Sequence, residues 1–375
     1  MALSKIRNDS LADTAVHGRR NLVINGAMQV WQRGTSKTGL TSGENYLVDR
    51  FRWKIANNGT WRIDQSTDTP NDSFKYSYKA ECTTADTSVG SVDQLRLITS
   101  LEGQDLVHLA YGSSAAKKTT LSFWIKSNKA ATYAITLEAG GGRNYTVHYT
   151  VDTANTWEHK TITINGDTTN VLGNQGNTAG IIFSWWFGVG TAYDSDETQD
   201  AWYSDGDYSG LTGGVTTNLA DTVGNNVYIT GVQLEVGDTA TPFEHRSFGE
   251  ELALCRRYYT KSGNIGTSTE WFAGVTTYAG YYNRTAPCFK ATTDRAWVFE
   301  NFPVTMRAAP TVTYYPGRSG VTNTAGSITQ YNTNVSVTTT YKPSSGTNGL
   351  NGYFQSTSSD NASGYTYQYT ADAEL

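Results

Sequence analysis

The chain has 375 residues and a formal net charge of −5, and only 17% of its residues are charged, against about a quarter in an average globular protein. Gly, Thr, Ser, Asn and aromatic residues (24 Tyr, 12 Phe and 10 Trp) make up the difference. This composition is typical of short β-strands joined by many turns, and it argues against a helical or α/β enzyme. The negative charge gives no electrostatic reason to expect a nucleic-acid partner.

The cysteines and the N-terminus indicate where such a protein is made. Cys82, Cys255 and Cys288 lie far apart and form no CxxC pair, so we expect neither a disulfide framework nor a zinc site. Residues 1–20 contain no apolar stretch of signal-peptide length, and the most apolar window, residues 180–187, is only as long as a strand. We therefore expect synthesis in a reducing cytoplasm, without a signal peptide and without membrane insertion.

Residues 1–20 contain isolated apolar residues, of which Ile6, Leu11 and Val16 are the candidate contacts, and no core of their own. They are predicted to form an arm that orders only against another protein. Strands are predicted from there on at residues 46–55, 60–64, 74–80, 94–98, 119–126, 132–138, 145–151, 158–164, 180–187 and 226–236. Residues 139–144 are predicted to form a hairpin turn. About ten strands without a long helix predict an all-β, two-sheet antiparallel sandwich of the jelly-roll kind over residues 21–246.

A connecting helix is predicted at residues 247–260, because Ser247 is a suitable N-cap and acidic residues in the first turn precede arginines in the last. The strand pattern then resumes and predicts a second, smaller β-sandwich over residues 261–375. Its strands are predicted at residues 270–282, 296–299, 311–315, 327–341, 352–356 and 364–370. The last of these carries three tyrosines on one face.

Signatures of catalysis are missing from the sequence. None of the five histidines has HExxH spacing, and no Gly-x-Ser-x-Gly elbow or complete dinucleotide fingerprint occurs. Glycosidase chemistry needs a pair of carboxylates, and nothing singles out a pair among the 34 acidic residues. We therefore expect a protein that is not an enzyme.

The densest polar cluster, residues 193–208, alternates acids with aromatics. Trp202 and Tyr203 could stack on a sugar while Asp205 and Asp207 accept hydrogen bonds from its hydroxyls. We prefer the alternative of a solvated insertion whose Trp202 packs back onto the sandwich.

Calcium binding by residues 193–208 is less favoured than either sugar binding or the solvated insertion. Asp194 and Asp196 begin like a calcium-binding loop, but the next ligand position is Thr198. No metal site is therefore predicted.

Adjacent aromatics supply the remaining candidates for glycan binding. Trp185 and Trp186 are neighbours in a strand and must face opposite sides, so one is expected in the core and the other toward solvent, a groove or a neighbouring subunit. The candidates of this kind are Trp186, Tyr281, Tyr282, Tyr314 and Tyr315. For any single one of them, a place in the core or in an interface is the simpler interpretation.

Several stretches resemble tail-fibre and receptor-binding proteins of tailed bacteriophages, especially marine and cyanobacterial phages. They are residues 20–34 (RNLVINGAMQVWQRG), 49–53, 121–126, 228–237 (YITGVQLEVG), 241–244, 255–259, 302–312 and 371–375. The resemblance implies a carbohydrate-binding-module-like jelly roll followed by a β-sandwich tip, assembled as a homotrimer on a virion. It assigns no ligand residues, because Asp49, Arg50 and Glu235, its polar positions, are explained by ion pairs or turn caps.

The resemblance implies a structural virion protein, a short tail fibre or distal adhesin that binds a host cell-surface glycan or receptor. Residues 1–20 would attach it to another tail or capsid protein. A head fibre, capsid decoration or tail adaptor with a purely structural role is the alternative. A glycan-degrading tail enzyme ranks third.

Overall fold

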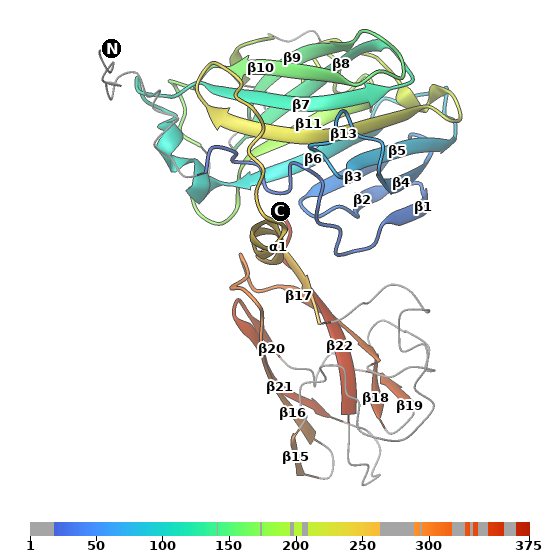
Figure 1. Ribbon diagram of the computed structural model, residues 1–375, viewed down its shortest axis with the longest axis vertical. Helices are drawn as coiled ribbons and strands as arrows, with labels where there is room; N and C mark the ends of the chain where they lie inside the picture. The colour runs from blue at the N-terminus through green and yellow to red at the C-terminus, as the bar shows by residue number, and fades with distance from the viewer. Residues whose placement is uncertain are drawn as a thin grey trace, which may run out of the picture. The chain divides into compact units, whose positions relative to one another are not determined.

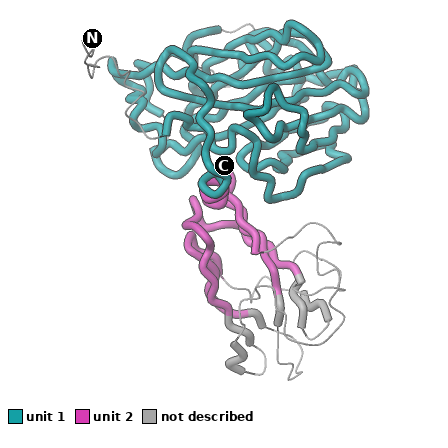
Figure 2. The backbone as a smooth tube through the Cα atoms, viewed as in Figure 1, with its two compact units in different colours: residues 1–251 teal, residues 252–375 magenta. Residues whose placement is uncertain are grey.

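The computed structural model describes residues 19–140, 142–172, 175–195, 199–204, 209–262, 289–292, 295–316, 327–330, 333–336, 344–355 and 365–375. The chain divides into two compact units, Met1–Glu251 and Leu252–Leu375 (Figure 2). The division falls inside the predicted connecting helix. In the described ranges, no helix has the length and apolar character needed to cross a membrane.

Unit 1 is a jelly-roll sandwich of two antiparallel sheets, as predicted (Figure 1). The six-stranded sheet has the order β1 (Ser36–Leu40), β4 (Thr60–Ser66), β5 (Ser77–Thr84), β13 (Asn226–Val236), β7 (Thr119–Ser127), β10 (Glu158–Ile164). The seven-stranded sheet has the order β12 (Trp202–Ser204), β9 (Arg143–Val151), β8 (Ala131–Ala139), β11 (Ala179–Val189), β6 (Gln94–Glu102), β3 (Phe51–Ala56), β2 (Gly43–Tyr46). Among the described residues, the 3₁₀ helices Gly103–Leu109 and Leu219–Asp221 connect strands.

The core between the sheets is rich in aromatic side chains. Leu121, Phe123 and Ile125, at alternate positions of β7, are fully buried in this core, where a strand was predicted at residues 119–126. Phe123 meets Trp185 of the other sheet edge to face, with ring centroids 5.8 Å apart. Because alternate residues of each strand must enter this core, the remaining residues of the strand face outward.

The predicted strand at residues 46–55 is wrong in one respect, because it is two strands, β2 and β3, joined by a turn at Asp49 and Arg50. The buried carboxylate of Asp49 accepts hydrogen bonds from the Gln32 N–H (2.8 Å) and the Arg33 guanidinium (3.1 Å), and Arg50 has φ +73°. These tertiary contacts turn the backbone at Asp49 and Arg50, although the apolar pattern that predicted a single strand continues through this stretch. The predicted hairpin at residues 139–144 is confirmed, since Ala139 pairs with Arg143.

Helix α1 (Phe248–Arg256) begins as predicted, with Ser247 Oγ accepting the Glu250 N–H at 3.3 Å. Unit 2 is the predicted second β-sandwich. One sheet has the order β14 (Tyr259–Lys261), β22 (Tyr365–Asp372), β18 (Ser327–Gln330), β19 (Thr333–Ser336), with β17 (Thr311–Pro316) also pairing with β22; the other has the order β15 (Phe289–Thr292), β16 (Arg295–Asn301), β21 (Gly349–Gln355), β20 (Ser344–Gly346). The predicted strand at residues 270–282 lies outside the described residues.

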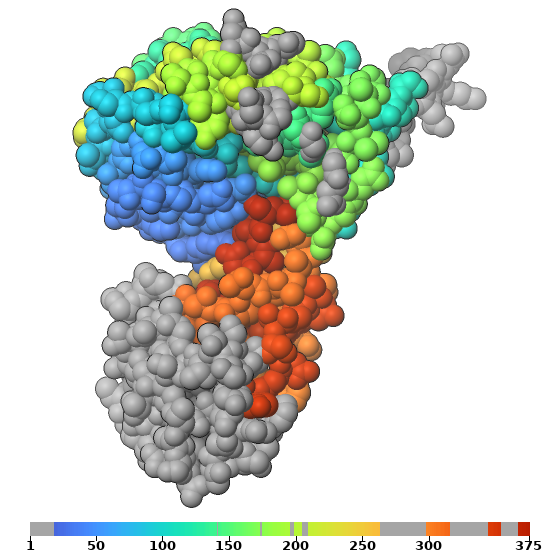
Figure 3. All heavy atoms as spheres, turned by 180° about the vertical axis from the view of Figure 1, so that it is seen from behind, coloured from blue at the N-terminus to red at the C-terminus, as the bar shows by residue number. Residues whose placement is uncertain are grey.

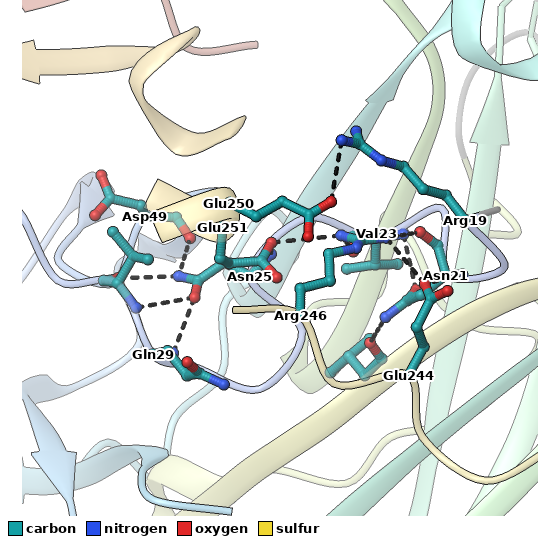
Figure 4. Close-up of polar contacts among 12 residues, drawn as sticks. Arg19, Asn21, Val23, Asn25, Gln29, Asp49, Glu244, Arg246, Glu250 and Glu251 are labelled. Atoms are coloured by element: carbon teal, nitrogen blue, oxygen red, sulfur yellow. Dashed lines mark hydrogen bonds and ion pairs between the residues drawn. The ribbon is translucent and has the colours of Figure 1, made fainter. Parts of the chain in front are cut away.

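A cluster of charged groups joins the two ends of unit 1 (Figure 4). The Glu244 carboxylate accepts the N–H of Asn21 at 2.9 Å, and the buried Glu251 carboxylate accepts the N–H of Asn25 at 2.5 Å. Between them, Arg246 donates to the Asn21 carbonyl. These charge-assisted hydrogen bonds hold the entering chain against the segment that leaves the sandwich.

The pKa of Glu244 predicts a pH-dependent part of the stability. Burial acts to raise this pKa, but the backbone N–H groups of Asn21 and Arg20, and the charge of Arg246, lower it below its ordinary value of 4.5. A lowered folded-state pKa contributes stability above the unfolded-state pKa, and this stability is lost as the pH falls through the folded-state pKa. We expect Glu244→Gln to reduce the free energy of unfolding by about 1 kcal/mol at pH 7 and by much less near pH 3, measured by urea unfolding.

The control is Glu250→Gln, which removes an exposed carboxylate paired with Arg19 at 3.0 Å. It should change the free energy of unfolding little at either pH. A loss in Glu244→Gln that is the same at both pH values would contradict the linkage.

Candidate functional site

The outer face of the seven-stranded sheet is partly covered by the chain itself. Residues 190–195 and 209–215, here called the covering segment, return over β8, β9 and β11. The Leu211 carbonyl accepts hydrogen bonds from the hydroxyls of Thr136 and Thr146, and the Thr212 carbonyl lies 2.9 Å from His148 Nε2. Figure 3 views unit 1 from this side, with the covering segment in yellow-green and the first strands in blue.

The Trp185–Trp186 pair faces opposite sides of the strand with one ring in the core, as expected, but Trp186 does not face solvent, so the sugar-binding alternative for it is wrong. Trp185 is fully buried in the core, and Trp186, on the opposite side of the strand, is only 1% exposed. The covering segment lies over it, with the Tyr193 ring 6.0 Å away, and its indole N–H donates to Thr136 Oγ1 at 3.0 Å. Its ring therefore offers no free face to a sugar.

Trp202 and Tyr203 are also used in packing. Trp202 is half-buried and meets the rings of Tyr111 and Tyr145 edge to face at 5.7 and 5.4 Å, which agrees with the packed-back alternative. Tyr203 is 8% exposed, and its hydroxyl lies 2.8 Å from Thr146 Oγ1. Both side chains hold the edge of the sheet in place.

The other predicted site residues are not brought together. Tyr314 is 2% exposed and packs against Tyr367 in the core of unit 2, while its neighbour Tyr315 is half-buried. Asp194 is half-buried, and no group of three or more His, Cys, Asp or Glu side chains among the described residues is placed to hold a metal ion. Ile6, Leu11, Val16, Asp196, Asp205, Asp207, Tyr281 and Tyr282 lie outside the described residues.

Beyond the covering segment, β2, β3 and β6 present a second kind of surface. Cross-strand pairing aligns Glu44, Lys54, Arg96 and Trp186 in one row, and the next row runs from Tyr46 through Arg52 to Ile98. Arg52 and Lys54 lie on the outer side of the sheet because their neighbours in β3 enter the core. Arg52 and Arg96 are each only 8% exposed there, and the Lys54 side chain is 28% exposed. We call this surface the charged face and define it as Glu44, Tyr46, Arg52, Lys54 and Arg96, together with Glu138 of β8, which pairs with Arg96.

Ion pairs fix the geometry of the charged face. A Glu44 carboxylate oxygen lies 3.1 Å from Arg52 Nε, and its other oxygen lies 3.7 Å from Lys54 Nζ. The Glu138 carboxylate lies 2.7 Å from Arg96 Nη1, and the Arg96 guanidinium lies 4.6 Å from the centre of the Trp186 ring. Side chains held in this way lose little conformational entropy when a ligand binds.

Tyr46 supplies the aromatic surface of the charged face. Its half-buried ring has the guanidinium of Arg33 at 5.0 Å and that of Arg52 at 6.0 Å from the ring centre. Its hydroxyl accepts a hydrogen bond from Arg52 Nη1 at 3.1 Å. An aromatic ring beside fixed donors and acceptors can pack against a sugar ring and bind its hydroxyls.

The opposite face of the sandwich carries a similar cluster of aromatic and cationic side chains. On the six-stranded sheet, the Lys126 ammonium lies 4.4 Å from the Tyr228 ring centre and 5.4 Å from that of Trp157, and it pairs with Asp68. Lys79 lies on the other side of Tyr228, at 5.6 Å. Like the charged face, this cluster has a tyrosine ring with two cations of the chain beside it, so it is a matched surface on the opposite sheet.

Sequence reasoning missed the charged face. The signal was present in residues 51–55, where Arg52 and Lys54 alternate with apolar residues, but this stretch was predicted only as part of the strand at residues 46–55. The interpretation of the motif positions as turn caps is confirmed for Asp49 and for Glu235, whose carboxylate accepts the Thr241 N–H at 2.8 Å.

No family model matches the chain, and no curated protein matches it. Several solved structures are similar to part of it. The enzymatically active domain of tailspike protein 4 from bacteriophage CBA120 is 12% identical with a TM-score of 0.31, and the match covers 58% of this chain and 21% of that one, about a fifth of its length. A family 11 carbohydrate-binding module from Clostridium thermocellum, in complex with a mixed-linked tetrasaccharide, is 12% identical (TM-score 0.26; 56% and 98% covered). A C-terminal family 22 module from the same organism is 14% identical (TM-score 0.28; 56% and 98% covered). What this chain binds has to be argued from its own residues.

The contacts of Tyr203 predict how firmly the covering segment is held. Its hydroxyl also donates to the Gly210 carbonyl at 2.9 Å, so Tyr203→Phe removes a link from the sheet to this segment. We expect a local loss of about 1 kcal/mol, seen as roughly fivefold faster hydrogen exchange in residues 209–215. Tyr133→Phe is the control, because its lost bond, to the Lys129 carbonyl at 2.8 Å, lies elsewhere. Equal exchange in both variants would show that Tyr203 does not hold the segment.

Proposed function

We propose that this chain is a non-catalytic virion protein, a short tail fibre or distal adhesin, that binds a host cell-surface glycan through the charged face. The observation that carries the proposal is the fixed array of guanidinium, ammonium and carboxylate groups beside Tyr46 on the part of the sheet beyond the covering segment. Pyranose rings present hydroxyls around the edge and C–H groups on the face. Such an array offers partners to both.

The proposal of binding without catalysis is supported by the ion pairs that the carboxylates of Glu44 and Glu138 form. Glu44 is paired with Arg52 and Lys54, and Glu138 with Arg96 and the Ser184 hydroxyl. In these pairs a carboxylate is suited to accept a hydrogen bond from a sugar hydroxyl. A glycosidase would instead need one carboxyl group that delivers a proton.

The assignment to a phage virion is supported by the tail-fibre-like stretches at residues 20–34 and 228–237. Residues 1–20 are the proposed attachment to another tail or capsid protein. Assembly as a homotrimer would present three charged faces at once, and this multivalency would strengthen grip on a repeating polysaccharide.

The test is binding of the labelled full chain to an array of immobilised bacterial lipopolysaccharides and capsular polysaccharides. We expect retention on at least one of them, and at least tenfold weaker binding by Tyr46→Ala. Tyr228→Ala is the matched control, since it removes a tyrosine with two neighbouring cations from the opposite sheet. It should bind as the unchanged chain does.

Three results would contradict the proposal. They are no retention on any polysaccharide, equal weakening by the two tyrosine variants, and release of new reducing ends from the bound polysaccharide. The first result would contradict glycan binding, and the second would contradict the assignment of binding to the charged face. The third would show that the protein is an enzyme.

A further inference from the structure

The charged face carries more positive than negative charge, although the chain as a whole has a net charge of −5. Its three cations, Arg52, Lys54 and Arg96, share the two carboxylates of Glu44 and Glu138. The short contacts belong to the arginines, at 3.1 and 2.7 Å. The excess of charge is therefore located at the lysine.

Lys54 is a cation without a close acceptor. Its side chain is 28% exposed, and its nearest carboxylate oxygen, on Glu44, is 3.7 Å away, too far for a hydrogen bond. Among the described residues, the Lys54 ammonium forms no side-chain hydrogen bond. Burial, and then the charge of Arg96, lowers the pKa of Lys54 against the opposing effect of Glu44 and Glu138. The ammonium thus has three donors to offer, in a partly buried position among two arginines and two carboxylates.

Arg96 extends this environment on the neighbouring strand. It is the cross-strand partner of Lys54, so the two Cβ atoms lie about 5 Å apart. Its Nη1 is used by Glu138 and Ser184, whereas its buried Nε has no hydrogen-bond partner within the described structure. At the centre of the charged face, the Lys54 ammonium thus has no hydrogen-bond acceptor and Arg96 has an unused donor beside it.

We infer that the glycan bound by the charged face is acidic, and that its sugar-borne anion, a carboxylate or a sulfate ester, binds the Lys54 ammonium while a sugar ring packs on Tyr46. This inference rests on the proposed function. A bound anion completes the hydrogen bonding of Lys54 through a charge-assisted bond, which is about twice as strong as a neutral one. A neutral sugar would displace water from the Lys54 ammonium without supplying a negative charge to pair with it, which weakens binding.

The test compares acidic polysaccharides with neutral counterparts of the same backbone. The probes are polygalacturonate and polysialate, each against its carboxyl-reduced form, and dextran sulfate against dextran. We expect the full chain to bind at least one acidic probe ten or more times tighter than its counterpart, and expect this preference to shrink as salt is raised. The carboxylate and sulfate arms show which anion is preferred.

Variants locate the effect. Lys54→Met keeps the length of the side chain and should abolish the preference for the acidic probe, whereas Lys54→Arg should retain most of it. Lys79→Met is the control, because Lys79 is a similarly half-buried lysine on the opposite sheet, paired with Glu81 at 2.5 Å. It should leave the preference unchanged.

Equal binding of acidic and neutral probes would overturn the inference and leave glycan binding intact. An acidic preference that survives in Lys54→Met would also overturn it. If the chain binds none of the six probes and no polysaccharide on the array, the proposed function itself is contradicted.

Discussion

The alternation of side chains around one aromatic core is the constraint on which the rest of unit 1 depends. Trp53, Trp61, Phe123 and Trp185 are fully buried between the two sheets. Because residues of a strand point alternately to its two faces, placing Trp53 in the core places Arg52 and Lys54 outside. A register shift of one residue would bury both charges, so the core and the charged face are set by the same pairing.

The outer face of the seven-stranded sheet is divided by how its polar groups are satisfied. Under the covering segment, Thr136, Thr146 and His148 bond to main-chain carbonyls, and this region is closed. Over β2, β3 and β6, the side chains neutralise one another in ion pairs, and Lys54 is left with its carboxylate at 3.7 Å. A partly buried ammonium without a hydrogen-bond acceptor, next to polar side chains that have one, indicates where a ligand would bind.

Local patterns in the sequence predicted most of the strands but not what lies above them. The predicted segments at residues 158–164 and 226–236 coincide with β10 and β13, because apolar residues there repeat with the strand period and turns bound them. Exposure of Trp186 to solvent or a sugar was the wrong alternative, since the covering segment lies over it, and no local pattern predicts such a long-range contact. The charged face was missed for a similar reason. Glu44 and Glu138 lie far apart in the sequence, and only the strand order brings them to one surface.

The most direct measurement is quantitative lysine acylation of the full chain, read by mass spectrometry, with and without polygalacturonate or whichever acidic polysaccharide it binds most tightly. If the glycan occupies the charged face, the acylation rate of Lys54 falls on binding while those of Lys79 and Lys126, on the opposite sheet, stay the same. Protection of Lys79 or Lys126, with Lys54 still reactive in the bound protein, would place the binding surface on the other side of the sandwich and contradict the account.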